Sequence, residues 1–277
     1  MIRKLAYGAG ALGASMFAAT AAWAAEAAET AEAVSDAAAD AAAAVPADVA
    51  EPAAEAAAAV ANPGNNAWMM TSTILVLLMI LPGLALFYGG LTRSKNMLST
   101  MTQIGAATAL AMLIWVMYGY GLAFGPEGNQ YISWGKFFLA GVTPDSTAAT
   151  FTDEVISEYV FISFQMTFAA ITAALVLGAT VERIKFSAVM VFVAVWLTIV
   201  YFPIAHMVWE ARGVFFAMGA LDFAGGTVVH INAGVSALVA AFILGKRRGY
   251  PAEPMPPHSM TLTMVGVSEC GGIGSAG

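Results

Sequence analysis

Residues 186–209 read FSAVMVFVAVWLTIVYFPIAHMVW and contain no Asp, Glu, Lys or Arg. As an α-helix, a run of this length crosses the roughly 30 Å hydrocarbon core of a bilayer, because each residue adds about 1.5 Å. The rest of the chain is similar: 60% of its 277 residues are hydrophobic and only 10% are charged. A soluble domain would carry about 25% charged residues. The sequence therefore predicts an all-α polytopic membrane protein.

Four further segments are apolar and long enough to span a membrane. We expect them at about residues 67–91, 102–124, 159–180 and 222–245, with a weaker, incomplete sixth candidate at 260–277. Pro82 and Gly83 should kink the first of these spans.

Positive charges are unevenly divided between the connections. Those after the first, third and fifth spans hold Arg93, Lys95, Arg183, Lys185, Lys246, Arg247 and Arg248. The opposite connections hold only Lys136 and Arg212. By the positive-inside rule, the first group is cytoplasmic and the mature N-terminus is periplasmic. We expect a multi-pass protein of the cytoplasmic (inner) membrane.

The N-terminal region precedes the first span. Arg3 and Lys4 stand before a small-residue apolar run that ends in Ala22-Trp23-Ala24, which is typical of a secretory signal peptide over residues 1–24. An uncleaved first membrane helix is the alternative. Residues 25–64 are Ala-rich and acidic, and we predict a disordered extracytoplasmic tail. Residues 65–277 then form the membrane domain.

The stretch LDFAGGTVVHINAG (221–234) places an acid and a histidine in an apolar span. Asp222 should cap the helix by accepting hydrogen bonds from first-turn N–H groups. The alternative is a charge that attracts a cation to the outer vestibule. His230 should lie about 12 Å deeper. A histidine at that depth is by default a candidate functional residue, and a satisfied structural histidine is the alternative.

Aromatic residues form a second set of candidates. Phe161, Phe164 and Phe168 recur at helical spacing, and Trp196 lies in the fourth span. Such faces usually serve packing, but they can also attract a partly desolvated cation.

The remaining histidines predict little chemistry. His206 should be a structural residue at the membrane interface, and His258 a solvated loop residue. A haem held between His206 and His230 is poorly placed, because the two lie at different depths. The sequence contains no phosphate loop, metal-ligand cluster, catalytic carboxylate pair or nucleophile motif, so we expect no enzyme, no cofactor and no nucleic-acid binding.

Four stretches in register carry a family resemblance: LPGLALFYGGLTRSKN (81–96), WVMYGYGLAFG (115–125), residues 186–209 and residues 221–234. They resemble the Amt/Mep/Rh ammonium transporters, of the bacterial Amt type, from about Asn65 to Lys246. The resemblance implies a homotrimer of eleven-helix bundles, each built from two inverted five-helix repeats. Ammonium or methylammonium would be the substrate, and a cytosolic PII-type protein the regulator. An ammonium-sensing receptor on the same scaffold is the alternative.

The resemblance also implies roles for particular residues. Phe164, Phe168, Trp196 and Ser275 would form the outer recruitment site. Phe168 would also be one of two gate phenylalanines, and His230 the first of two pore histidines. Asp222 would match a structural acid of the family. The cation would lose a proton and cross as ammonia through an apolar pore.

The C-terminal stretch GVSECGGI (266–273) departs from the family pattern. Gly271 stands where the second gate phenylalanine is expected, Gly272 stands where an asparagine is expected, and Glu269 has no evident partner. The family is longer, and its second pore histidine has no counterpart here. We therefore expect a transporter truncated after roughly the first repeat, which does not conduct by itself.

Overall fold

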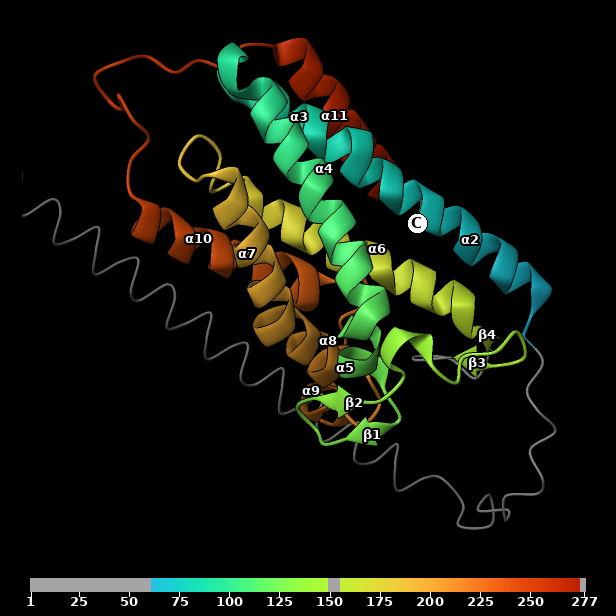
Figure 1. Cartoon of the computed structure of the whole chain (residues 1–277). Helices are drawn as coiled ribbons and strands as arrows, with labels where there is room; N and C mark the ends of the chain where they lie inside the picture. The colour runs from blue at the N-terminus through green and yellow to red at the C-terminus, as the bar shows by residue number, and fades with distance from the viewer. Residues whose placement is uncertain (1–60, 149–154, 275–277) are drawn as a thin grey trace, which may run out of the picture. The chain divides into compact units, whose positions relative to one another are not determined.

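The computed structural model describes residues 61–148 and 155–274 (Figure 1). They belong to one compact unit that covers Ala59–Gly277. The predicted signal peptide, nearly all of the predicted tail and Ser275 lie outside the described residues.

Within the described residues, five helical segments are long and apolar enough to cross a membrane: Pro63–Leu91, Ser94–Phe124, Glu158–Leu177, Phe186–Ala217 and Gly226–Leu244. This confirms the five predicted spans. The α-helices are α2 (Pro63–Leu78), α3 (Ala85–Leu91), α4 (Met97–Ile114), α5 (Tyr120–Phe124), α6 (Glu158–Leu177), α7 (Phe186–Trp196), α8 (Phe202–Trp209), α9 (Val214–Ala217), α10 (Asn232–Leu244) and α11 (Met260–Gly274). π-Helical turns cover Met79–Leu84, Trp115–Gly119, Leu197–Tyr201 and Gly226–Ile231.

The first span begins and bends where its sequence dictates. The Asn62 side chain accepts hydrogen bonds from the backbone N–H groups of Gly64 and Asn65, so the helix starts at Pro63, ahead of the domain boundary predicted at residue 65. The backbone of Leu81 is non-helical, at φ −130° and ψ 101°. Pro82 follows and has no N–H to continue the helical ladder, so the predicted kink is confirmed.

The second and third spans approach closely through small side chains. Ala107 and Ala111 of α4, and Ala170 and Ala174 of α6, have no exposed surface, and the two helices pack together. Alanines one turn apart let membrane helices come close enough for backbone and side chains to interlock. Trp115 adds a bond between the spans, because its indole N–H donates to the carbonyl oxygen of Ile162 at 3.1 Å.

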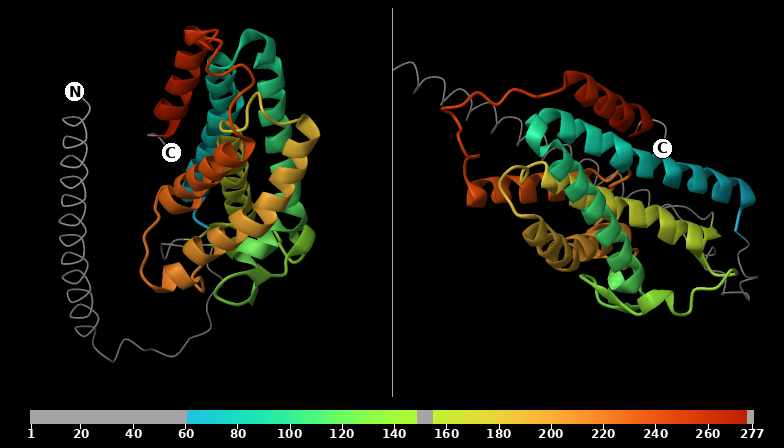
Figure 2. Two further views of the ribbon diagram at one scale, coloured as in Figure 1. Left: turned by 90° about the vertical axis from the view of Figure 1, so that its left-hand side faces the viewer. Right: turned by 45° about the horizontal axis from the view of Figure 1, so that its top comes forward.

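The weaker sixth candidate is helix α11, which lies alongside α2 and α3 (Figures 1 and 2). It has 15 residues, fewer than the roughly 20 that span a bilayer. Glycines allow this close contact: a Cβ on Gly266 would lie 2.4 Å from the backbone nitrogen of Phe87.

The connections after the first, third and fifth spans meet at one end of the bundle. Arg93 and Arg247 both form ion pairs with Glu182, and the Nδ1 atom of His258 donates to the carbonyl oxygen of Thr92 at 2.9 Å. We call this end, residues 92–96, 178–185 and 245–259, the basic end. His258 is exposed apart from this one bond.

The opposite end holds the long connection after the second span. Its two short antiparallel pairs are β1 (Glu127–Gly128) with β2 (Ser133–Trp134) and β3 (Thr147–Ala148) with β4 (Ile156–Ser157). Glu158 is buried at the start of α6, where it accepts a hydrogen bond from the Tyr120 hydroxyl at 2.6 Å and pairs with Lys136. These contacts fasten the connection to two spans.

His206 also fastens this connection, and its side chain is fully buried near the end of α8. Its Nδ1 lies 2.8 Å from the carbonyl oxygen of Ala123, and its Nε2 lies 2.7 Å from that of Asn129. The structural role expected for His206 therefore fits. A haem ligand needs a free ring nitrogen, so this geometry argues against haem binding at His206.

Candidate functional site

Three aromatic rings from two helices form a continuous cluster. Phe164 and Phe168 lie one turn apart on α6, and their rings meet edge to face at a centroid distance of 4.9 Å. Phe168 also meets Trp209 of α8 edge to face, at 5.8 Å. We call Phe164, Phe168 and Trp209 the aromatic cluster. The faces of such rings carry negative charge density and attract cations, most strongly away from water.

The prediction that Trp196 joins Phe164 and Phe168 is wrong. The Trp196 ring stacks on Phe192 and packs against Tyr201, and its indole N–H donates to the Ser236 hydroxyl at 2.9 Å. Trp196 lies about 20 Å along the helix axis from Trp209 at 1.5 Å per residue. Trp209, which the sequence reasoning did not select, takes the place expected of Trp196.

Asp222 connects the aromatic cluster to the start of the fifth span. Its side chain is buried, and its two carboxylate oxygens accept hydrogen bonds from the backbone N–H groups of Thr227 and Val228 at 3.1 and 2.9 Å. Its backbone carbonyl oxygen accepts the indole N–H of Trp209 at 3.0 Å. Asp222 therefore caps the start of the fifth span and also holds the indole ring of Trp209 in place.

Replacing Asp222 by alanine should leave two first-turn N–H groups without an acceptor. We expect the free energy of unfolding to fall by about 1–2 kcal/mol, the usual loss for an N-cap. Asn should lose less, because its single side-chain oxygen still accepts one bond. The apparent melting temperatures of the three purified proteins check this order. Equal temperatures for wild type and Asp222→Ala would contradict it.

His230 lies closer to the helix start than predicted. Gly225 adopts a left-handed backbone at φ 73°, which ends a turn over residues 222–225 and places the first helical residue at Gly226. At 1.5 Å per residue, His230 is then about 6 Å into the span instead of about 12 Å.

One of the two ring nitrogens of His230 forms a hydrogen bond within the protein. Nδ1 lies 3.0 Å from the carbonyl oxygen of Gly225. A carbonyl can only accept, so Nδ1 is the donor, and in the neutral ring Nε2 remains an acceptor. The ring is exposed in the described part of the chain, as are the neighbouring Ile231 and Val235.

The fifth span as a whole is thinly covered. Only 22% of its most apolar window is buried by the described residues, compared with 67% for the third span. His230 therefore lies on an exposed face of the fifth span, whereas in the aromatic cluster Trp209 is buried and Phe164 and Phe168 are partly buried. Within residues 61–148 and 155–274, no group of three His, Cys, Asp or Glu side chains is arranged to hold a metal ion.

Comparison with known proteins assigns a family to this arrangement. A profile described as Ammonium Transporter Family matches residues 67–268. An ammonium transporter of Mycobacterium tuberculosis (strain ATCC 25618 / H37Rv) is 42% identical over 230 residues, covering 76% of this chain and 48% of that protein. One of Bacillus subtilis (strain 168) is 43% identical over 206 residues, covering 73% and 48%.

Solved structures agree with the sequence relatives. The crystal structure of Saccharomyces cerevisiae Mep2 is similar with a TM-score of 0.67 at 36% identity, covering 77% of this chain and 49% of that one. A structure titled Sensor Amt Protein is similar with a TM-score of 0.67 at 27% identity, covering 76% and 52%. The chain spans about half the length of the relatives that it matches.

Proposed function

The chain belongs to the ammonium transporter family, and from that premise we propose that it takes part in moving ammonium or ammonia across the cytoplasmic membrane. The observation that carries the proposal is the contact of Phe168 with Trp209, beside a buried Asp222 that fixes the indole. Because the chain matches about half of each relative, transport is a proposal for the protein in which these spans work, whatever further residues complete it.

The aromatic cluster would bind the cation first. The ring faces of Phe164, Phe168 and Trp209 offer cation–π attraction worth about 0.5–2 kcal/mol, with the larger values where water is excluded. Carrying the charge further is costly, since a cation at the bilayer centre costs about 3 kcal/mol or more. Ammonium avoids this cost by releasing a proton to water at the outer end of the path and continuing as ammonia. Potassium has no proton to release, so selectivity would come from deprotonation rather than from pore width.

His230 would act further along the path. Its Nε2 is free to accept a hydrogen bond from ammonia, or a proton, while Nδ1 stays fixed on Gly225. The exposed face around His230 indicates that other residues must close the path there. A second wall, supplied by further chain or by a partner, is part of the proposal.

Membrane placement is also part of the proposal. The meeting of three Lys- and Arg-rich connections at the basic end supports a cytoplasmic location for that end, and the positive-inside rule then places the aromatic cluster toward the outside. The homotrimer, the signal peptide and a PII-type regulator rest on the resemblance and the sequence pattern alone.

Two matched tryptophan variants test the aromatic cluster. Trp209 and Trp196 are 5% and 6% exposed, and each donates one indole hydrogen bond, so leucine removes similar contacts at both. We expect Trp209→Leu to weaken methylammonium binding by about tenfold, which corresponds to roughly 1.4 kcal/mol of lost cation–π attraction. Trp196→Leu should leave binding unchanged. The measurement is a calorimetric titration of the purified chain.

An equal loss of methylammonium binding in both variants would contradict a role of the aromatic cluster in binding. A loss of binding in Trp196→Leu alone would also contradict it. A melting curve for each variant separates weaker binding from unfolding.

An ammonium receptor is the second candidate, and the similarity to the structure titled Sensor Amt Protein favours keeping it. A receptor and a transporter would share the aromatic cluster, so binding alone does not separate them. A measurement of methylammonium uptake separates the two functions. Methylammonium binding that depends on Trp209, without any uptake, would favour the receptor.

A further inference from the structure

His206 is a buried titratable side chain outside the aromatic cluster. It has no exposed surface, and it lies in the last turn of α8, which packs against α5 (Figure 1). Its Nδ1 lies 2.8 Å from the carbonyl oxygen of Ala123 in α5, and its Nε2 lies 2.7 Å from that of Asn129 in the connection after the second span. The ring therefore bridges two carbonyl oxygens.

Both of these neighbours can only accept hydrogen bonds. A neutral imidazole has a single N–H, so it donates to one of the two oxygens and turns a lone pair toward the other. At 2.7 or 2.8 Å, that lone pair and the carbonyl oxygen repel each other. Turning the ring over places ring carbons against the same oxygens, so the other ring orientation fits no better. An imidazolium has two N–H groups and satisfies both oxygens.

The surroundings of His206 also favour a positive charge. The last turn of a helix carries partial negative charge on its unpaired carbonyl groups, which stabilises a cation there. The acids nearest in the sequence have other partners: Glu210 pairs with Arg212 at 3.1 Å, and the Asp222 carboxylate accepts hydrogen bonds from two backbone N–H groups. Among the described residues, no carboxylate pairs with His206, so no counter-ion in contact cancels its field.

This charge would lie close to the aromatic cluster. His206 and Trp209 are three residues apart on α8, so their Cβ atoms are about 5–6 Å apart. A cation bound to the indole lies within about 6 Å of the ring centroid, so the two positive charges would be roughly 10 Å apart. Both side chains are buried, and the field between them is therefore screened less than in water.

We propose that His206 is an imidazolium whose charge promotes the release of a proton from ammonium at the aromatic cluster, an inference that rests on the proposed function. A nearby positive charge destabilises ammonium but acts little on neutral ammonia, so it favours the deprotonated form. The N–H bond breaks, its electron pair stays on the nitrogen, and water at the outer end of the path takes the proton. The aromatic rings and the imidazolium thus act in opposite directions on the bound cation.

Nitrogen-15 NMR of the purified full chain, labelled at histidine, tests the charge directly. The double variant His230→Gln, His258→Gln leaves His206 as the only one of the three histidines, and both replaced side chains are exposed. At neutral pH we expect both ring nitrogens of His206 to carry a proton. A His206 ring with one proton-free nitrogen would overturn the proposal.

Calorimetric titration with methylammonium tests the effect of the charge. His206→Gln keeps N–H donors at this position and removes the charge. We expect this variant to bind methylammonium about tenfold more tightly than wild type, the effect of one charge roughly 10 Å away at an effective dielectric constant of about 20. The direction of the change is decisive, because losing a merely structural contact would loosen α8 and weaken binding.

Tyr120→Phe is the matched control. It removes another buried hydrogen bond of the same connection, from the Tyr120 hydroxyl to Glu158 at 2.6 Å, without removing a charge. It should leave methylammonium binding unchanged or weaken it slightly. Unchanged or weaker binding in a folded His206→Gln protein would overturn the proposal, as would tighter binding in both variants. If the wild type bound no methylammonium, the proposed function would fail, whereas the ring nitrogens would still decide the charge of His206.

Discussion

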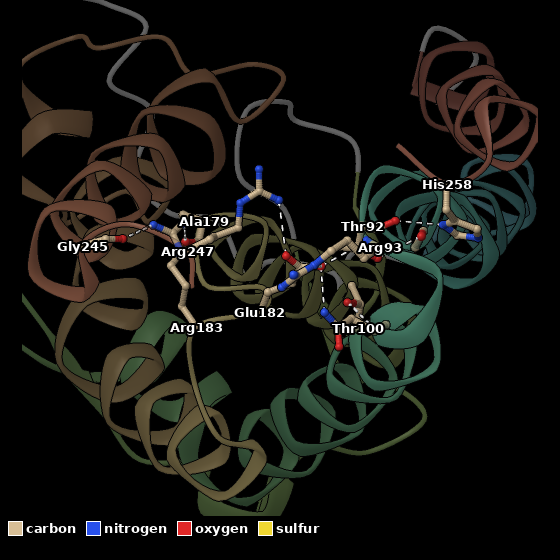
Figure 3. Close-up of polar contacts among 11 residues, drawn as sticks. Thr92, Arg93, Thr100, Ala179, Glu182, Arg183, Gly245, Arg247 and His258 are labelled. Atoms are coloured by element: carbon tan, nitrogen blue, oxygen red, sulfur yellow. Dashed lines mark hydrogen bonds and ion pairs between the residues drawn. The ribbon is translucent and has the colours of Figure 1, made fainter. Parts of the chain in front are cut away.

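Replacing Glu182 by glutamine should lower the free energy of unfolding by about 3 kcal/mol, because it removes the only carboxylate that joins the described connections of the basic end. The Glu182 side chain has no exposed surface. One oxygen accepts from the backbone N–H and the Nε of Arg93 and from the Asn96 amide, at 3.1, 3.2 and 2.8 Å. The other faces Arg247 (Figure 3).

The effect of Glu182 should depend on pH. Burial acts to raise the pKa of Glu182, but the hydrogen bonds from Asn96 and Arg93 outweigh it and lower the pKa from 4.5 to about 2. A carboxyl group with a lowered folded-state pKa stabilises the fold fully above its ordinary value, and this stabilisation is lost as pH falls. The difference in melting temperature between wild type and Glu182→Gln should therefore shrink between pH 4.5 and pH 2.

Glu253→Gln serves as the control for this experiment. Glu253 is an exposed carboxylate of the same end, so its replacement should change the melting temperature little. If Glu182→Gln and Glu253→Gln behaved alike at neutral pH, the ion-pair network would not hold the three connections together.

The second large effect is expected at Gly266, where α11 contacts the first span. A Cβ there would lie 2.4 Å from the Phe87 nitrogen and 2.6 Å from the Gly83 carbonyl oxygen. Both neighbours are backbone atoms, so the helices must separate. Gly266→Ala should cost about 2–3 kcal/mol, the upper range for overpacking. Thermal unfolding measures the loss.

The contact of α11 has a second readout and a matched control. Cys270 is partly buried, with its thiol donating to the carbonyl oxygen of Met79 at 3.4 Å, so separation of α11 should speed its labelling by maleimide. Gly105→Ala is the control, because a Cβ there meets no atom within 4 Å. It should be neutral or slightly stabilising. Similar behaviour of the two alanine variants would mean that α11 does not pack at Gly266.

Hydropathy was sufficient to predict the spans, because the apolar stretch at 186–209 has few alternatives to crossing a membrane. It could not place the helix start at Gly226, since a left-handed Gly225 is invisible in an apolar run that already contains glycines. Nor could it predict that Glu182 would gather two arginines from connections far apart in the chain. Long-range ion pairs depend on the fold, whereas span positions depend on local composition.

In the aromatic cluster, too, some members could be predicted from local sequence and one depends on the fold. Phe164 and Phe168 follow from their helical spacing, because residues four apart share one face. Helical spacing does not decide whether Trp196 or Trp209 joins them, because both tryptophans lie on the fourth span and both are buried. Only the packing of α8 on its neighbours decides which indole reaches Phe168. The position of Trp209 at the end of that span, toward Asp222, was the one available signal.

Methylammonium uptake tests our proposal that ammonium enters through the aromatic cluster, where Phe168 contacts Trp209. Cells without another ammonium transporter would carry this chain fused to the unmatched half of the Mycobacterium tuberculosis relative, which supplies a second wall. We expect saturable uptake of radiolabelled methylammonium that Trp209→Leu lowers about tenfold and Trp196→Leu leaves unchanged. Uptake that depends on Trp196 and is indifferent to Trp209 would contradict it.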